Sequence, residues 1–586
     1  MPYLLPALWT ISCLFFGLAR AVPDNSQFKV HSLPDNPALP PSWAGRLPIP
    51  NTAPGNTLFF WLFQTEDPVY DDNLLIWFNG GPGCSSLIGL TTGNGPISFE
   101  GNSTRATTNP YAWSKFGHLL YIDQPVGTGY STASHPYPAI DNDVVTSQFY
   151  AWLQLFFAQF PHLRSKQVHM MGESWAGIYI PYFASAIVEN QGSFPINLRS
   201  ITLGDASIGN PAAMSTVTIE KFLESHQSLL RIPDEVLDVY REAGETCGFE
   251  KILEEAAQFP PESTIHIPGN PENLNYKHRR QQRLRRDLND VANGSCNINP
   301  TTPEKVRSSI IHSSCYGRCA TFATAMDYLS SVSASGVGKP CFDVYDISHD
   351  CSTANSLSLV SSYFSRADVQ AALNIAKRPT SASAADAGNP GPSPSEYAAC
   401  NSTILDILLG SQSPRAPVYS ILPTLVTSHN ISLHIYFGEY DMLLNHYGAE
   451  LVLQNMTWHG AQGFSQPINR PFYSDNAAPF LSRHPRGGSG SRSRGRNSTS
   501  TLTTTRTQDS YHNASSSSSS SSSLDKPPRP NARNSKPVEA CPMSEAGKWA
   551  SERGVTYHLF WGAGHSVFAT KPREMFAYVR DVVVAA

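Results

Sequence analysis

The sequence predicts an α/β fold in which a mostly parallel central sheet carries helices on both faces and an inserted cap region interrupts the core. Two observations support this prediction. Short apolar segments rich in strand-forming residues alternate with segments of helical periodicity, as is typical of parallel sheets covered on both faces. Between residues 210 and 350 this alternation stops, and helix-like and loop segments with five cysteines take its place. The chain of 586 residues is long enough for more than one compact unit.

The first 21 residues resemble a secretory signal peptide. An apolar run spans residues 4–18, and the segment ends in the small-x-small sequence Ala19-Arg20-Ala21. A membrane anchor is the alternative, but the run is too short and contains a proline. We therefore expect the chain to enter the secretory pathway. Since we see no second apolar span, we expect the mature chain to have no membrane-spanning segment.

Cysteines and glycosylation sequons agree with this compartment. Removal of Cys13 with the signal leaves nine of the ten cysteines, so at least one thiol is free or paired between molecules. The Cys315-x3-Cys319 spacing suggests a metal site or a disulfide-bearing loop, and the disulfide is favoured because no histidine and cysteine cluster completes a metal site. Seven Asn-x-Ser/Thr sequons indicate a glycosylated protein: Asn102, Asn293, Asn401, Asn430, Asn455, Asn497 and Asn513.

The charge distribution argues against nucleic acid as a partner. The formal net charge is −5, with no global basic field. The one dense basic run, residues 277–286, is by default a solvated surface segment. Its paired basic residues, Arg279-Arg280 and Arg285-Arg286, also suit a processing protease. We therefore predict that this linker is nicked in the secretory pathway.

The first strands lead to a glycine-rich loop. Residues 22–56 are proline-rich and predict an extended lead-in, whereas residues 57–64 and 74–78 predict strands. The second strand runs into the sequence NGGPGCSS at residues 79–86. Such a loop brings backbone N–H groups close to a ligand, but it lacks the lysine of a phosphate-binding loop. A tight turn and an oxyanion hole are the interpretations that remain.

A serine stands in a predicted strand-to-helix turn. A strand is expected at residues 118–122, then a helix at 144–160 that stops at Pro161. The next strand, 168–172, continues into GESWAG and a helix at 178–190, which exposes the hydroxyl of Ser174 on a sharp turn. A further strand, at residues 200–203, ends in Gly204-Asp205.

The remaining strands come after the cap. Residues 433–437 predict a strand followed by GEYD, and residues 555–561 predict the last strand, followed by GAGHS and a helix at 572–583. The expected organisation begins with a signal peptide (1–21), followed by a first core segment (22–209), the inserted cap (210–350) and a second core segment (351–474). A low-complexity and disordered insertion (475–540) and a last core segment (541–586) complete the chain.

Three residues that follow predicted strands, Ser174, Asp441 and His565, occur in the chain order of α/β-hydrolases. His565 is expected to accept the Ser174 proton and to deliver it to the leaving group, while Asp441 fixes the imidazole tautomer. The oxyanion needs two donors, and we assign the backbone N–H groups of Gly81 and Trp175. No metal or organic cofactor is implied.

Five sequence blocks resemble the serine carboxypeptidase family: residues 79–86, 123–127, 172–177, 438–441 and 562–565. The resemblance covers about residue 50 to the end, apart from the insertions. It implies an α/β-hydrolase fold and a secreted or vacuolar exopeptidase that removes C-terminal residues from peptides, most active in acid. It further implies that Asn79, Gly80 and Glu173 bind the free carboxylate of the substrate, and that Cys84 forms a disulfide with Cys351.

Four positions depart from the family pattern. Gly93 stands where a second glutamate usually shares the carboxylate-binding work, and we expect Gly93→Glu to lower the KM of free-acid substrates more than that of amides. Trp175 replaces the tyrosine that usually follows the nucleophile, Ser566 replaces a methionine, and Phe568 replaces a proline. The preferred substrate side chains therefore do not follow from the resemblance.

Two other functions stay open from the sequence. An esterase or acyltransferase that kept the triad and weakened its carboxylate selection would be consistent with Gly93. A non-catalytic secreted glycoprotein is the third interpretation, and the presence of Ser174, Asp441 and His565 argues against it.

Overall fold

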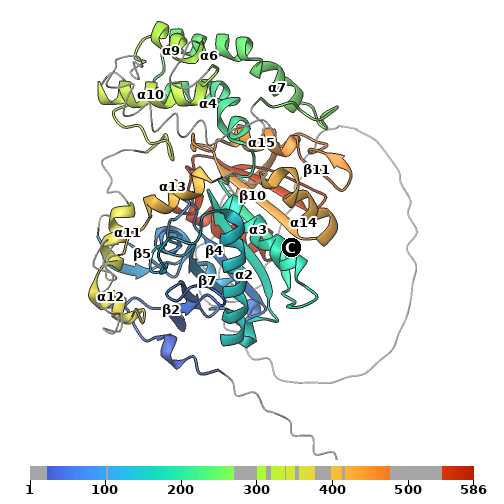
Figure 1. The fold of residues 1–586 in the computed structure, drawn as a ribbon. Coiled ribbons are helices and arrows are strands. Elements are labelled where there is room, and N and C mark those ends of the chain that lie inside the picture. Colours follow the sequence, from blue (N-terminus) through green and yellow to red (C-terminus); the bar gives the residue numbers. More distant parts are fainter. Residues whose placement is uncertain are drawn as a thin grey trace, which may run out of the picture. The chain divides into compact units, whose positions relative to one another are not determined.

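An eleven-stranded sheet forms the centre of the fold (Figure 1), in the order β1-β2-β3-β7-β4-β8-β9-β10-β15-β14-β13. The computed structural model describes residues 23–99, 103–268, 300–311, 318–336, 338–349, 356–375, 397–411, 416–474 and 544–585. The predicted signal peptide, the basic linker and the low-complexity insertion lie outside the described residues.

Six neighbouring strands of this sheet run parallel to one another. They are β7 (His118–Asp123), β4 (Asn73–Phe78), β8 (Gln167–Glu173), β9 (Leu198–Gly204), β10 (Ser432–Gly438) and β15 (Val555–Phe560). Most of their residues are buried, as expected for parallel strands covered on both faces. Since the carboxyl ends of parallel strands share one edge, the loops after β4, β8, β9, β10 and β15 meet there.

Antiparallel strands extend the sheet on both sides. They are β1 (Lys29–Val30), β2 (Ser42–Pro48), β3 (Thr57–Phe63), β14 (Ser544–Glu552) and β13 (Arg470–Ser474). The prediction of an extended lead-in at residues 22–56 did not include the pairing of β1 and β2 into the central sheet. β2 contains no β-branched residue, and its conformation is set by the ladder that it forms with β3.

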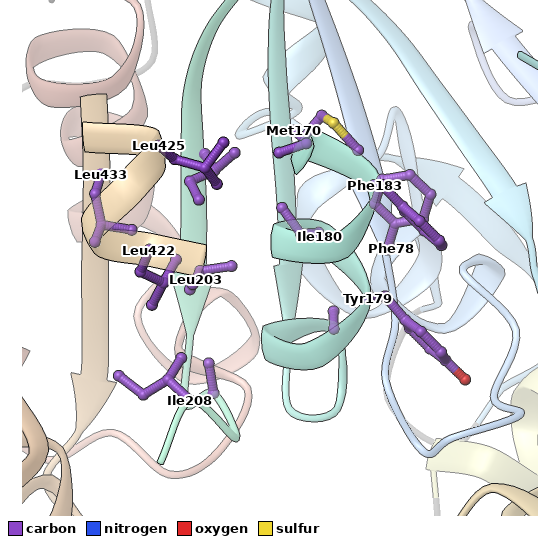
Figure 2. Packing of buried hydrophobic residues seen from close by; sticks show 14 of the residues in the cluster. Phe78, Met170, Tyr179, Ile180, Phe183, Leu203, Ile208, Leu422, Leu425 and Leu433 are labelled. Atoms are coloured by element: carbon purple, nitrogen blue, oxygen red, sulfur yellow. The ribbon is translucent and has the colours of Figure 1, made fainter. Parts of the chain in front are cut away.

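One face of the sheet is covered by helices of the first hydrophobic cluster. They include α2 (Asn142–Gln159), α3 (Ala176–Glu189), α13 (Ser402–Gly410), α14 (Ile421–His429) and α15 (His446–Gln454). Figure 2 shows Ile180 and Phe183 of α3 beside Met170 of β8 and Phe78 of β4. α3 begins one residue after Trp175, so this packing anchors the turn that carries Ser174.

The opposite face carries a second cluster, because side chains alternate along each strand. On β4, for example, Leu74 and Ile76 belong to the first cluster and Leu75 and Trp77 to the second. The elements that contribute to this face are α1 (Leu87–Gly89), α11 (Ser356–Phe364), α12 (Ala367–Ala372), α16 (Val567–Thr570), α17 (Pro572–Tyr578) and the π-helix η9 (Val579–Val583).

The region between β9 and α11 contains cap helices with a hydrophobic cluster of their own. They are α4 (Ile219–Ser225), α5 (Gln227–Leu230), α6 (Asp234–Cys247), α9 (Pro303–Ile311) and α10 (Thr321–Ala334). α7 (Phe249–Ala256) lies in the same region of the chain, but its buried residues Phe249 and Ile252 belong to the first cluster. Met442, from the loop after β10, belongs to the same cluster, so the cap packs onto the loop that carries Asp441. A disulfide joins Cys247 to Cys319, which confirms the disulfide interpretation for Cys319.

Two short hairpins complete the described fold: β5 (Ile97–Phe99) with β6 (Ala106–Thr108), and β11 (Thr457–Trp458) with β12 (Ala461–Gln462). None of the described helices is both long enough and apolar enough to cross a membrane.

Candidate active site

The backbone at Ser174 is strained and held from three sides. Its φ of 62° lies in the left-handed region, where a serine is uncommon. The Ser174 N–H donates to the carbonyl of Gly204 at 3.0 Å, and the Ser174 carbonyl accepts from the N–H groups of Gly177 and Ser207, each at 3.0 Å. The residue is half-buried, so a rigid turn between β8 and α3 leaves the side chain partly accessible.

Asp441 and His565 form a buried pair at the ends of neighbouring strands. The His565 Nδ1 lies 2.6 Å from the Asp441 Oδ2, while the Asp441 Oδ1 accepts from the N–H of Leu443 at 2.9 Å. Burial opposes the imidazolium, but the charge and hydrogen bond of Asp441 outweigh it and raise the pKa of His565. This arrangement fixes which ring nitrogen faces the carboxylate and leaves Nε2 for proton transfer.

The glycine-rich loop after β4 lies directly against the Ser174 turn. A Cβ added at Gly80 would stand 2.4 Å from the Trp175 nitrogen and 2.8 Å from the Ser174 Cβ, so only glycine fits there. Gly81 adopts a φ of 110°, which also favours glycine. Within the described residues, no hydrogen bond engages the N–H groups of Gly81 and Trp175. Both N–H groups therefore lie in the correct loops to serve as oxyanion donors.

Glu173 is held between two side chains from other loops. The Asn79 Nδ2 donates to the Glu173 Oε1 at 2.7 Å, and the Ser566 hydroxyl donates to the Glu173 Oε2 at 3.0 Å. The Asn79 amide cannot flip, because its Oδ1 accepts from the Trp77 indole at 2.8 Å and from the Gly89 N–H at 3.0 Å. Asn79 therefore keeps one amide N–H free of Glu173.

Burial raises the pKa of Glu173 to about 7. The positive charge of His565 and the hydrogen bonds from Ser566 and Asn79 act in the opposite direction, and the negative charge of Asp441 adds to the rise. Below this pH the carboxyl is mostly neutral and has an O–H to donate. A buried neutral carboxylic acid next to a serine turn is suited to bind an anion such as a carboxylate.

Position 93 has no room for a side chain. A Cβ added at Gly93 would stand 2.5 Å from the Phe568 carbonyl oxygen, a backbone atom that has little freedom to move. The expectation that Gly93→Glu improves the binding of free-acid substrates is therefore replaced by an expected clash. The Phe568 ring is buried against Trp77 and Trp113, which fixes the backbone that closes this position.

The disulfide of the glycine-rich loop differs from the expected one. Cys84 pairs with Cys400, so its assignment to Cys351 is wrong. The backbone explains the choice, because Ser85 N–H donates to the Ala399 carbonyl at 2.8 Å and Asn401 N–H donates to the Gly83 carbonyl at 2.9 Å. These bonds place residue 400 directly beside residue 84.

Asp205 belongs to the site, and its role was not recognised from the sequence. One carboxyl oxygen of Asp205, one of Asp441 and one ring nitrogen of His565 all lie within 4.8 Å of one another. The Asp205 Oδ1 accepts from the Gly438 N–H at 2.8 Å, whereas its Oδ2 is buried and has no partner among the described residues. Burial, reinforced by Asp441, raises the pKa of Asp205 well above its ordinary value. The available signal was its position directly after a central strand.

Three of the seven sequons lie in the described part of the chain. Asn430 is exposed at the end of α14, whereas the half-buried Asn401 and Asn455 donate their amides to the carbonyls of Gly127 and Ile265. The other four, Asn102, Asn293, Asn497 and Asn513, fall outside the described residues. Asn430 is therefore the most accessible of the three for a glycan.

The architecture defines the class of protein. A mostly parallel sheet, a serine on a strained strand-to-helix turn and an aspartate–histidine pair on later loops are the features of an α/β-hydrolase. The structure of Kex1(delta)p, a prohormone-processing carboxypeptidase from Saccharomyces cerevisiae, matches with a TM-score of 0.59 over 96% of both chains. At 18% sequence identity this match shows the fold alone.

Sequence comparisons identify the family. The family model described as serine carboxypeptidase matches residues 41–523. A carboxypeptidase Y homolog from Arthroderma benhamiae is 41% identical over 571 residues, which cover 97% of this chain and 96% of the relative. The pheromone-processing carboxypeptidase kex1 of Talaromyces stipitatus is 26% identical over 471 residues, 78% of this chain and 62% of that protein. The chain belongs to the serine carboxypeptidase family and is a serine-type carboxypeptidase.

Proposed function

We propose that Ser174, His565 and Asp441 carry out peptide hydrolysis through an acyl-enzyme. The Ser174 Oγ attacks the carbonyl carbon of the last peptide bond while its proton passes to the His565 Nε2. The N–H groups of Gly81 and Trp175 stabilise the oxyanion. Collapse of this intermediate breaks the C–N bond while His565 protonates the departing amine. Water then adds to the acyl carbon and gives a proton to His565; the bond to the Ser174 Oγ breaks, His565 returns the proton to Oγ, and the acid product leaves. The 2.6 Å contact between His565 and Asp441 supports this proposal.

We further propose that Glu173, Asn79 and Gly80 bind the free carboxylate of the substrate. The observation that carries this assignment is that Glu173, next to Ser174 in the chain, is buried and bonded to the orientationally locked amide of Asn79. A neutral Glu173 donates its O–H to the carboxylate, and Asn79 offers its remaining N–H. The backbone of Gly80 lies against the serine turn, since an added Cβ would stand 2.8 Å from both the Glu173 carbonyl oxygen and the Ser174 Cβ.

Acidic conditions favour this binding mode. The ionised form of Glu173 repels a carboxylate, so kcat/KM for free-acid substrates should fall as pH rises through about 7, the pKa of Glu173. The negative charge of ionised Glu173 also raises the pKa of His565, so a neutral Glu173 makes the catalytic base easier to deprotonate. Both effects support an enzyme that works best below neutrality.

A set of matched substrates tests the proposal. A blocked dipeptide with a free C-terminus, its amide and its ester are incubated with the secreted protein from pH 4 to pH 9. We expect release of the C-terminal amino acid from the free acid, favoured in acid and absent in Ser174→Ala. Ester cleavage without acid-favoured release from the free acid would instead support an esterase or acyltransferase, the alternative that Gly93 suggests.

We also propose that the protein enters the secretory pathway, is secreted or vacuolar, and is cleaved by a processing protease at the paired basic residues of the linker 277–286. The signal-like segment and the basic pairs support this. We analyse the intact mass of protein secreted from a fungal host. Without reduction we expect one mass, that of two pieces held together by disulfides, and with reduction we expect the masses of the two separate pieces. A single uncut chain would refute the cleavage.

A further inference from the structure

We propose that Ser566 is a specificity-determining residue: its hydroxyl forms, with Glu173 and Asn79, the unit that distinguishes a free C-terminus from an amide. This inference rests on the carboxylate-binding role proposed above for Glu173. Ser566 follows His565 directly, so one short loop after β15 supplies both the proposed base and the proposed recognition hydroxyl.

The geometry gives each Glu173 oxygen one partner. Oε1 accepts the Asn79 amide at 2.7 Å, and Oε2 accepts the Ser566 hydroxyl at 3.0 Å. Since Glu173 Oε1 faces the Asn79 Nδ2, which only donates, a proton on neutral Glu173 is favoured on Oε2, on the Ser566 side. A substrate carboxylate that receives this proton in a hydrogen bond then leaves the Ser566 hydroxyl free to donate to the same anion.

The surrounding packing holds Ser566 in this place. Ser566 stands at the start of α16, and its carbonyl accepts from the Ala569 N–H at 2.9 Å. Two residues further on, the Phe568 ring packs on Trp77 with centroids 5.2 Å apart, and the Trp77 indole holds the Asn79 amide. Gly93 lies so close to the Phe568 carbonyl that no side chain fits at position 93, so no side chain from that position competes with Ser566 for Glu173.

The identity of the partner determines how recognition depends on pH. Neither the Ser566 hydroxyl nor the Asn79 amide titrates in the working range, so Glu173 is the one group of the three that ionises. The charges of His565 after β15 and Asp441 after β10 act on the pKa of Glu173 through space. Ionised Glu173 in turn raises the pKa values of Asp205 after β9 and of Tyr436 on β10. None of them has a hydrogen bond to Glu173 among the described residues. The Ser566 hydroxyl therefore stabilises the ionised form of Glu173 and sets where recognition is lost.

The test compares Ser566→Ala with Ser566→Thr, which keeps the hydroxyl, and with Thr570→Ala, which removes an exposed hydroxyl from the same short helix. We measure kcat and KM for the blocked dipeptide acid, amide and ester from pH 4 to pH 9. Titration of active sites with an organophosphate corrects each variant for the fraction that is folded.

For Ser566→Ala we expect the ratio of free-acid to amide kcat/KM at pH 5 to fall roughly tenfold, mainly through the KM of the free acid. The alkaline limb of the free-acid profile should move up by about one pH unit, because ionised Glu173 loses a donor. Ser566→Thr should restore both values, and Thr570→Ala should match the wild type. In a Glu173→Gln background, Ser566→Ala should no longer shift the limb.

Two results would overturn the assignment: an unchanged alkaline limb in Ser566→Ala, or equal losses on the acid, the amide and the ester. Its failure can be told apart from that of the proposed function. If the wild-type enzyme shows no preference for the free acid, both the proposed carboxylate binding by Glu173 and the role of Ser566 are refuted. If the preference survives in Ser566→Ala, only the role of Ser566 is refuted.

Discussion

Acid should destabilise this protein through three histidines buried in its central sheet, even though its proposed activity is favoured in acid. His169 on β8, His434 on β10 and His558 on β15 have at most 2% of their surface exposed. Burial lowers their pKa values to about 3, 4 and 3. Each ring is therefore neutral in the folded protein at a pH where it is protonated in the unfolded chain.

The size of the effect follows from His434. Its pKa is about 4 when folded and 6.5 when exposed, so its contribution to stability is present above pH 6.5 and is lost as pH falls toward 4. At about 1.4 kcal/mol per pH unit, one such histidine removes about 2 kcal/mol between neutrality and pH 5. Three of them remove about 6 kcal/mol, a large part of the ~5–15 kcal/mol typical of folded proteins.

The perturbation is His434→Gln, which cannot titrate and can still hydrogen-bond to the Thr556 hydroxyl, now 2.9 Å from the His434 Nδ1. Urea unfolding followed by tryptophan fluorescence at pH 7, 6 and 5 gives the free energy of unfolding. We expect the loss between pH 7 and pH 5 to be about 2 kcal/mol smaller in the variant than in the wild type. His31→Gln, at an exposed position, is the control. Parallel pH dependence of His434→Gln and wild type would refute the reasoning.

Three further predictions concern the site. Asp205→Asn should stabilise the protein at pH 7 but not at pH 4. A carboxyl whose pKa is raised by folding weakens the folded state once the pH exceeds the pKa of the same carboxyl in the unfolded chain. Equal changes in the urea midpoint at both pH values would contradict this. Gly93→Glu should destabilise by about 1–3 kcal/mol through the clash with the Phe568 carbonyl and reduce acid and amide hydrolysis alike, and a gain confined to free acids in the same assays would argue for space at this position. Peptide mapping without reduction should recover Cys84 linked to Cys400, and a Cys84–Cys351 peptide would show a different pairing.

The central strands were predictable because they are buried on both faces. A strand expected at residues 433–437 forms as Ser432–Gly438, and one expected at 555–561 forms as Val555–Phe560. Short runs rich in apolar and aromatic residues, as in these two strands, need no partner to be recognised. β2 and β14 were missed because their sequences mix small, polar and charged residues, and pairing with a neighbouring strand determines their conformation.

Side-chain partners were much less predictable than the positions of the motifs. The disulfide was assigned to the wrong cysteine, since Cys400 is brought to Cys84 by backbone bonds between segments far apart in the chain. Asp205 carried a sequence signal of the same kind as Asp441, a position just after a central strand, but nothing local indicated that both carboxyls converge on His565.

The sequence by itself determined the strand-to-helix turn at Ser174, the order of Ser174, Asp441 and His565, and the glycines that allow the loop after β4 to approach them. Each of these features depends on local backbone requirements and on the position of a residue after a strand. The tertiary structure alone decided that Ser566 faces Glu173 and that position 93 is closed. Those contacts depend on how the loops of β4, β8 and β15 pack at one edge of the sheet, and no local sequence pattern specifies that packing.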